Sequence, residues 1–151
     1  MDEIPFTFLR KLVSEPRIIK SLRPSSQKKV HGTALTIRVT DASLKAQLKA
    51  IDAAKPGDVV VAVAESMYAV VWDPFLSMLA EKKHLAGAVI DGVAEKDDSF
   101  PVYAREFVEF DPFKEHAIDT RYRGSPPDFS PIEIDNCRIE CGDVLVGEGN
   151  E

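Results

Sequence analysis

The charged run from Glu95 to Asp98 is the part of this chain whose residue types could do chemistry, because a lysine stands among carboxylates. In layered α/β domains, ligands bind near the carboxyl ends of parallel strands. The run follows Asp91-Gly92 at the end of a predicted buried strand. It is therefore a candidate binding loop. The alternative is a solvated turn between two strands, which charged runs in loops commonly form.

A second loop, Glu65 to Trp72, follows the preceding predicted strand. In layered α/β domains, ligands gather at the carboxyl ends of parallel strands. Consecutive strands of a βαβ unit usually lie close together in one sheet. The loop Glu65 to Trp72 and the loop Gly92 to Ser99 are therefore expected to lie near each other.

The elements that must position these loops alternate between strands and helices. Strands are predicted where β-branched or apolar runs occur, and the two central runs show no polar alternation. The predicted strands are Gly32–Val39, Val59–Ala64, Gly87–Val93, Phe100–Glu109, Ile132–Asp135, Arg138–Cys141 and Val144–Val146. Helices interleaved with buried strands, followed by a strand-rich end, predict a layered α/β domain with a mixed sheet.

Three helices are predicted from apolar residues at helical spacing. The first spans Ile4 to Val13, and the second follows an N-cap at Asp41. The third begins at Asp73-Pro74, because an aspartate side chain accepts hydrogen bonds from the amides of the first turn and proline suits the first helical position.

Length and composition fit one globular domain. The chain has 151 residues, of which 44% are apolar and 29% charged, enough for a sizeable core. We divide it into an N-terminal helix and basic connector, residues 1–30, and an α/β domain, residues 31–151. No run approaches the roughly 18 apolar residues that span a bilayer, and Met1-Asp2-Glu3 does not resemble a secretory signal. We therefore expect a cytoplasmic protein without a membrane partner.

The charge is unevenly distributed. Residues 1–31 contain seven Lys and Arg against three Asp and Glu, a net charge of +4. Because the whole chain has a net charge of −6, residues 32–151 carry −10. An acidic body repels nucleic acid, so only the basic segment Arg10 to Lys29 could bind phosphates. The favoured interpretation is a solvated helix face or a segment that docks on an acidic neighbour.

The cysteines and histidines show no spacing of a metal site or a catalytic triad. Cys137 and Cys141 match no zinc or thioredoxin-like pattern, and we expect reduced, structural residues on one face of a strand. The histidines His31, His84 and His116 are expected at the surface or an interface.

An ordered set of motifs carries a resemblance over residues 30–147. The motifs are Gly32-Thr33-Ala34-Leu35-Thr36, Pro56-Gly57-Asp58-Val59-Val60-Val61, Val71-Trp72, Leu85-Ala86-Gly87-Ala88-Val89-Ile90-Asp91-Gly92, Pro101-Val102-Tyr103-Ala104-Arg105 and Cys141-Gly142-Asp143-Val144-Leu145-Val146. In order and spacing the chain resembles the regulator of ribonuclease activity A family, which also contains the 4-hydroxy-4-methyl-2-oxoglutarate aldolases.

The resemblance implies a swivelling β/β/α domain assembled as trimers or hexamers, with sites between subunits. Enzymes of the family cleave pyruvate-yielding aldols and decarboxylate oxaloacetate with Mg²⁺ or Mn²⁺. A divalent ion and an arginine supply the positive charge that a developing pyruvate enolate requires. In active members an Arg-Asp pair follows the strand that ends in Asp-Gly. The arginine binds the substrate carboxylate, and the aspartate holds the metal.

This chain departs from that pattern at both loops. The aligned pair is Glu95-Lys96, which reverses the charges that the reaction needs. A shift of one residue gives Lys96-Asp97, with Lys96 as substrate-binding and catalytic candidate and Asp97 as catalytic candidate and metal ligand. Active relatives carry Gly-Glu after the tryptophan, where open amides at a helix N-terminus hold the substrate carboxylate. Asp73 and Phe75 are the substrate-binding candidates here, although the proline between them has no amide hydrogen.

Two classes of function compete, with a weaker third. The first is a divergent family member that has lost the lyase chemistry and acts as an oligomeric binding or regulatory protein with a protein partner. The second is a metal-dependent aldolase or oxaloacetate decarboxylase that acts on a small 2-oxo acid. In the third, the basic N-terminal segment meets RNA or an acidic partner. The altered residues at both loops favour the first.

Overall fold

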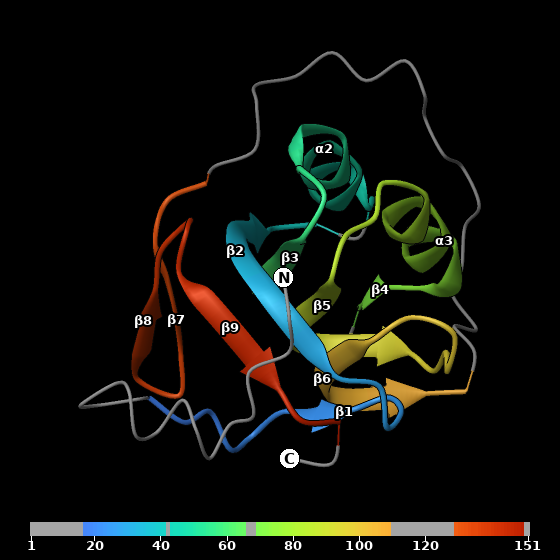
Figure 1. The fold of residues 1–151 in the computed structure, drawn as a ribbon. Helices are drawn as coiled ribbons and strands as arrows, with labels where there is room; N and C mark the ends of the chain where they lie inside the picture. Colours follow the sequence, from blue (N-terminus) through green and yellow to red (C-terminus); the bar gives the residue numbers. More distant parts are fainter. Residues whose placement is uncertain (1–16, 42, 66–68, 110–128, 150–151) are drawn as a thin grey trace.

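The computed structural model describes residues 17–41, 43–65, 69–109 and 129–149, which form nine strands and two helices. Figure 1 shows both helices on one side of a curled sheet. The predicted helix Ile4 to Val13 lies outside the described residues. Among the helices that are described, none is long and apolar enough to cross a membrane.

Seven strands form one mixed sheet in the order β1-β6-β5-β3-β2-β9, with β4 beside β5. The neighbours β2, β3, β5 and β6 are parallel, as are β4 and β5, whereas β1 and β9 run antiparallel to β6 and β2. The sheet strands are β1 (Arg23–Pro24), β2 (Val30–Val39), β3 (Asp58–Ala64), β4 (Val70–Trp72), β5 (Gly87–Glu95), β6 (Val102–Val108) and β9 (Val144–Gly147). The prediction of an α/β domain with a mixed sheet is confirmed.

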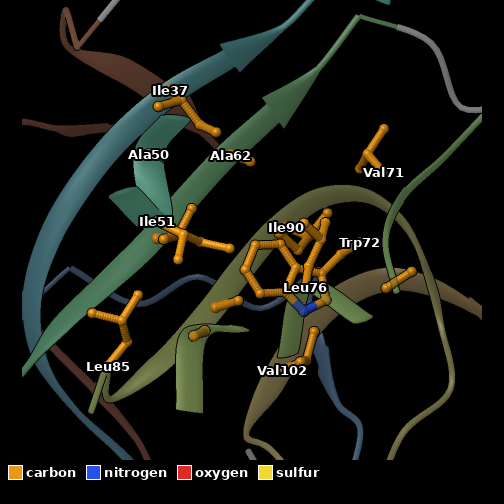
Figure 2. Packing of buried hydrophobic residues seen from close by; sticks show 14 of the residues in the cluster. Ile37, Ala50, Ile51, Ala62, Val71, Trp72, Leu76, Leu85, Ile90 and Val102 are labelled. Carbon is orange, nitrogen blue, oxygen red and sulfur yellow. The ribbon is translucent and has the colours of Figure 1, made fainter. Parts of the chain in front are cut away.

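The helices α2 (Lys45–Ala53) and α3 (Pro74–Lys82) cover one face of the sheet. The buried positions of β3 explain the arrangement, because Val60 and Ala62 face the helices while Val59 and Val61 face the opposite side. Both sides of this central strand are therefore covered, as its uninterrupted apolar run predicted. Trp72 is fully buried within the helix-side cluster (Figure 2).

A hairpin of β7 (Ile132–Ile134) and β8 (Cys137–Ile139) covers part of the other face. Its turn residues Asp135 and Asn136 have φ angles of 52° and 63°, as in a type I′ turn, whose twist matches that of the strands. The hairpin packs isoleucines onto β2 and β3. The second core cluster contains Leu22, Val30, Ala34, Val59, Val61, Tyr103, Ile132, Ile134 and Ile139.

Among the predicted element bounds that differ from the structure, three change an interpretation. Helix α2 begins at Lys45 after an N-cap at Leu44, and Asp41 instead accepts a hydrogen bond from the Ser43 amide (2.9 Å) in a local turn. Strand β5 extends two residues beyond its predicted end, to Glu95. Strand β8 ends before Cys141, so the two cysteines do not share a strand. Both are free thiols.

Candidate functional site

The two predicted loops lie at adjacent strand ends. Strand β4 pairs in parallel with the last part of β5, with Val70 beside Val93 and Trp72 beside Ala94. The segment predicted as a loop, Glu65 to Trp72, thus contains a short strand. The carboxyl ends of β4 and β5 are neighbours, so the expected proximity of the two loops is confirmed for their described residues.

Asp73 caps helix α3 with its own carboxylate. Its Oδ1 accepts a hydrogen bond from the Leu76 amide at 2.9 Å, and the residue is only 5% exposed. Pro74 occupies the first turn and has no amide hydrogen. Because the aspartate already places negative charge at the positive end of the helix, a substrate carboxylate would have to compete with it. Phe75 follows as a half-buried residue of the same turn.

Lys96 and Asp97 follow β5 directly. The Lys96 amide donates to the Val108 carbonyl at 2.7 Å, which continues the β5–β6 pairing one residue beyond Glu95. Glu95 therefore belongs to the strand, and the turn begins after it. The Lys96 side chain is exposed. Asp97 Oδ1 accepts hydrogen bonds from the Ser99 amide (2.9 Å) and the Ser99 hydroxyl (2.7 Å).

The described residues supply few protein ligands for a divalent ion. No three His, Cys, Asp or Glu side chains are grouped for metal binding within the part of the chain that the structure describes. Both hydrogen bonds from Ser99 go to Asp97 Oδ1, which would have to share or exchange them to become a metal ligand, whereas Oδ2 takes part in neither of them. Magnesium needs near-octahedral oxygen coordination. A single carboxylate of this turn leaves most of the coordination sphere to water or substrate.

A second charged group lies on the sheet face opposite the helices, and the pairing of its residues was not predicted from the sequence. Arg105 on β6 forms an ion pair through Nε with Asp91 on β5, and its Nη2 lies 3.3 Å from Asp135 Oδ1 at the hairpin turn. Ser21 donates to Asp135 Oδ2 through its amide at 3.1 Å and also through its hydroxyl. The Ser21 hydroxyl is the main cause that lowers the pKa of Asp135, and the hydrogen bond to Asp91 raises the pKa of Arg105.

Strand pairing in the sequence could have indicated that Asp91 and Arg105 lie close together. Ile90 pairs with Ala104 on parallel neighbours, so the next residues, Asp91 and Arg105, point to the same face of the sheet. The contact with Asp135 has no comparable signal, because the hairpin is distant in sequence. The guanidinium is engaged by two carboxylates and joins three segments of the chain. Its geometry is that of a structural ion-pair network.

Gln47 is a buried polar residue for which no role was predicted from the sequence. It is 1% exposed in α2, and its Nε2 donates to the Val71 carbonyl at 2.8 Å. Its Oε1 has no hydrogen-bond partner among the described residues. The amide joins α2 to β4, the strand that leads into Asp73. This hydrogen bond therefore helps to fix the position of β4 next to the candidate site.

Comparison with known proteins places this chain in a family. A family model described as RraA-like, Aldolase/RraA, matches residues 2–150. The comparison with curated proteins gave no significant match.

Several solved structures share the fold. The RNA-processing inhibitor RraA from Thermus thermophilus matches with a TM-score of 0.76 at 17% identity, over 99% of this chain and 91% of that one. RraAS2 from Streptomyces coelicolor, described as an unusual member of the RNase ES inhibitor RraA family, gives 0.60 at 20% identity, over 82% and 65%. A structure described among novel cellulases from gut-associated microbes gives 0.67 at 19% identity, over 94% and 66%. This chain thus spans just under two thirds of the latter two proteins. Since the family model covers nearly the whole chain, the protein belongs to the RraA-like, Aldolase/RraA family.

Proposed function

We propose that this protein is a divergent RraA-like family member whose lyase site is degraded and which acts as an oligomeric binding or regulatory protein. The observation that carries the proposal is the N-terminus of α3. There the buried Asp73 carboxylate takes the Leu76 amide that a substrate anion would need. Pro74 removes another donor from the same turn. The anion cradle is therefore filled by the protein itself.

The loop after β5 supports the same proposal. Glu95 lies in the strand, one residue before the exposed Lys96, so a carboxylate stands where the family pattern expects an arginine. Lysine lacks the two-pronged geometry with which arginine binds a carboxylate. Asp97 is engaged with Ser99. Substrate clamp and metal ligand are thus both weakened relative to the family pattern.

A regulatory role is supported by relatives whose structures are described as inhibitors of RNA processing or of RNase ES. By this analogy the proposal includes a homotrimer or hexamer and a protein partner in the cytoplasm. Nucleic acid is disfavoured as a partner, because the body of the chain carries most of the negative charge. Mass measurement in solution tests the assembly. The expected mass is three or six times the 16.7 kDa of the chain.

The alternative function is a divalent-metal-dependent aldolase or oxaloacetate decarboxylase that produces pyruvate. The adjacency of the β4 and β5 ends favours it, since this brings Asp73 and Phe75 toward the loop that carries Lys96. In this alternative Lys96 would bind the carboxylate of a 2-oxo acid and Asp97 would hold Mg²⁺ or Mn²⁺. The ion would supply positive charge for an enolate. A neighbouring subunit could supply the missing arginine.

Oxaloacetate decarboxylation separates the two functions. The parent protein is assayed with Mg²⁺ or Mn²⁺ and with a chelator, beside Asp97→Ala and the matched control Asp98→Ala, which removes the neighbouring exposed carboxylate. We expect turnover no faster than with the metal alone in all three proteins. Metal-dependent turnover that is lost in Asp97→Ala and kept in Asp98→Ala would establish the enzyme and reject the degraded site.

A further inference from the structure

The connection between β5 and β6 is unusually short. These strands are parallel neighbours, with Ala88 beside Val102 and Glu95 beside Val108. The chain must return from the carboxyl end of β5 to the amino end of β6 through residues 96–101, whereas such a crossover usually needs a dozen residues or more. We call residues 96–101 the crossover. It contains Lys96 and Asp97.

Both ends of the crossover are fixed, and part of it is buried. At one end the Lys96 amide donates to Val108 (2.7 Å), and at the other the Ala88 amide donates to the Pro101 carbonyl (3.0 Å). Phe100, 3% exposed, packs into the helix-side core. A short segment that is held in this way has little slack. A further contact at its middle therefore bears directly on the position of Asp97.

The basic connector supplies that contact. Its strand β1 runs antiparallel to β6, and beyond it the Ser25 amide donates to the Val102 carbonyl at 2.7 Å while the Val102 amide donates to Ser25 Oγ at 3.3 Å. The connector thus follows β6 back to the crossover. There Lys28 Nζ donates to the Ser99 carbonyl at 2.5 Å.

The turn that precedes Lys28 packs against the end of the described chain. The Gly149 amide donates to the Tyr103 hydroxyl at 2.7 Å, and a Cβ at Gly149 would lie 2.3 Å from the Gln27 carbonyl oxygen. Gly149 has a φ of +85°, which favours glycine. The turn before Lys28 is therefore packed between β6 and the segment after β9.

Ser99 joins Lys28 to Asp97. Its carbonyl accepts the Lys28 ammonium, while its amide and hydroxyl donate to Asp97 Oδ1. The cation thus reaches the candidate site loop from a segment about 70 residues earlier in the sequence. A hydrogen bond from a charged donor is stronger than one between neutral groups. A contact that fixes Ser99 therefore also fixes the Asp97 carboxylate, which accepts hydrogen bonds from Ser99.

We propose that the connector is a strap on the candidate site and that Lys28 is the positioning residue through which it acts. With Lys28 on Ser99, the Asp97 carboxylate stays engaged within the crossover. When Lys28 is released, Ser99 loses this contact to the connector, and Asp97 Oδ1 can exchange its hydrogen bonds with Ser99 for another ligand. The inference rests on the site location in the proposed function and holds whether or not lyase chemistry survives.

Backbone dynamics by ¹⁵N relaxation test the strap in the full chain. The variant Lys28→Met removes the donor, Lys28→Arg keeps one, and Lys20→Met is the matched control at another exposed lysine of the connector. In Lys28→Met we expect the order parameter of the Ser99 amide to fall from about 0.85 toward 0.6, the range of flexible loops. Lys28→Arg should restore it, and Lys20→Met should leave it unchanged.

The relaxation experiment tests the strap, and the lyase assay tests the proposed function, so either proposal can be refuted without the other. An unchanged Ser99 order parameter in Lys28→Met would overturn the strap, whatever the decarboxylation assay shows. A fall in Lys28→Met that Lys28→Arg does not reverse would also overturn it, because the ammonium contact would then not be the cause. A fall with rescue supports the strap even in a protein without turnover.

Discussion

Arg105 and Asp91 form an ion pair across a β-bulge, on the sheet face opposite the helices. The β5–β6 register shifts between Ile90 and Val93, so Asp91 and Gly92 on β5 lie opposite the single residue Arg105 on β6. A bulge of this kind bends a strand and re-aims its side chains. Here it directs the Asp91 carboxylate to the guanidinium, just before the strand reaches the candidate site.

Removal of Arg105 should destabilise the protein more than removal of its outer partner. The side chains of Arg105 and Asp91 are 31% and 15% exposed, so Arg105→Ala leaves a largely buried carboxylate unpaired. We expect a loss of about 1–3 kcal/mol in the free energy of unfolding, and less than about 1 kcal/mol for Asp135→Ala. Urea unfolding measures both. Equal losses in the two variants would contradict the assigned geometry.

Acid should remove the contribution of Asp135. Hydrogen bonds from Ser21 lower the pKa of this carboxyl in the folded protein, so its stabilisation is present above the unfolded pKa of about 3.9 and is lost as the pH falls through the lower folded value. The parent should be more stable than Asp135→Asn at pH 7, and the difference should shrink below pH 4. A difference that stays constant from pH 7 to pH 3 would show that the carboxylate is not the stabilising group. Ser21→Ala provides the matched test of the donor.

Asp73 should behave as a helix cap. Asp73→Ala loses the bond to the Leu76 amide and should cost about 0.5–2 kcal/mol in the free energy of unfolding, whereas Asp73→Asn keeps a capping oxygen and should cost less. Thermal or urea unfolding distinguishes the two variants. If Asn is as damaging as Ala, the negative charge and not the capping oxygen is what the helix requires.

The buried Gln47 offers a pH-dependent test. Gln47→Glu places a carboxylate in a site that is 1% exposed, so burial raises the pKa of the new group and its protonated form can still donate to Val71. We expect a loss of about 2–4 kcal/mol at pH 7. The folded pKa lies above the unfolded value, so the loss should diminish as the pH falls toward 5. Gln47→Met, which cannot titrate, is the control, and its stability relative to the parent should not change over this range.

Two glycines should respond differently to alanine. A Cβ at Gly32 would lie 2.3 Å from the Gly57 carbonyl oxygen, so the paired ends of β2 and β3 must move apart. Gly142 has open space around it and a φ of +95°. We expect Gly32→Ala to cost more than the roughly 1 kcal/mol of left-handed strain expected for Gly142→Ala. Calorimetric unfolding of the two variants measures the order, and the reverse order would refute the close approach.

The local signals in the sequence were reliable where the cause of a structure is local. The apolar runs of β3 and β5 predicted buried parallel strands, and Asp73-Pro74 predicted the start of α3, because the cap and the first turn lie within four residues. Asp41 led to a wrong helix start, because its side chain forms a different local structure. It forms a turn with Ser43, and α2 begins only at Lys45.

The sequence by itself determined the α/β class, the central strands, the cap of α3 and the family. Only the tertiary structure placed β4 beside β5, kept Glu95 in a strand, set Arg105 between Asp91 and Asp135, and brought Lys28 to Ser99. The physical reason is that these features depend on strand pairing and on side chains from distant segments. No local propensity encodes such contacts. The candidate site loop is therefore held by residues from other segments of the chain.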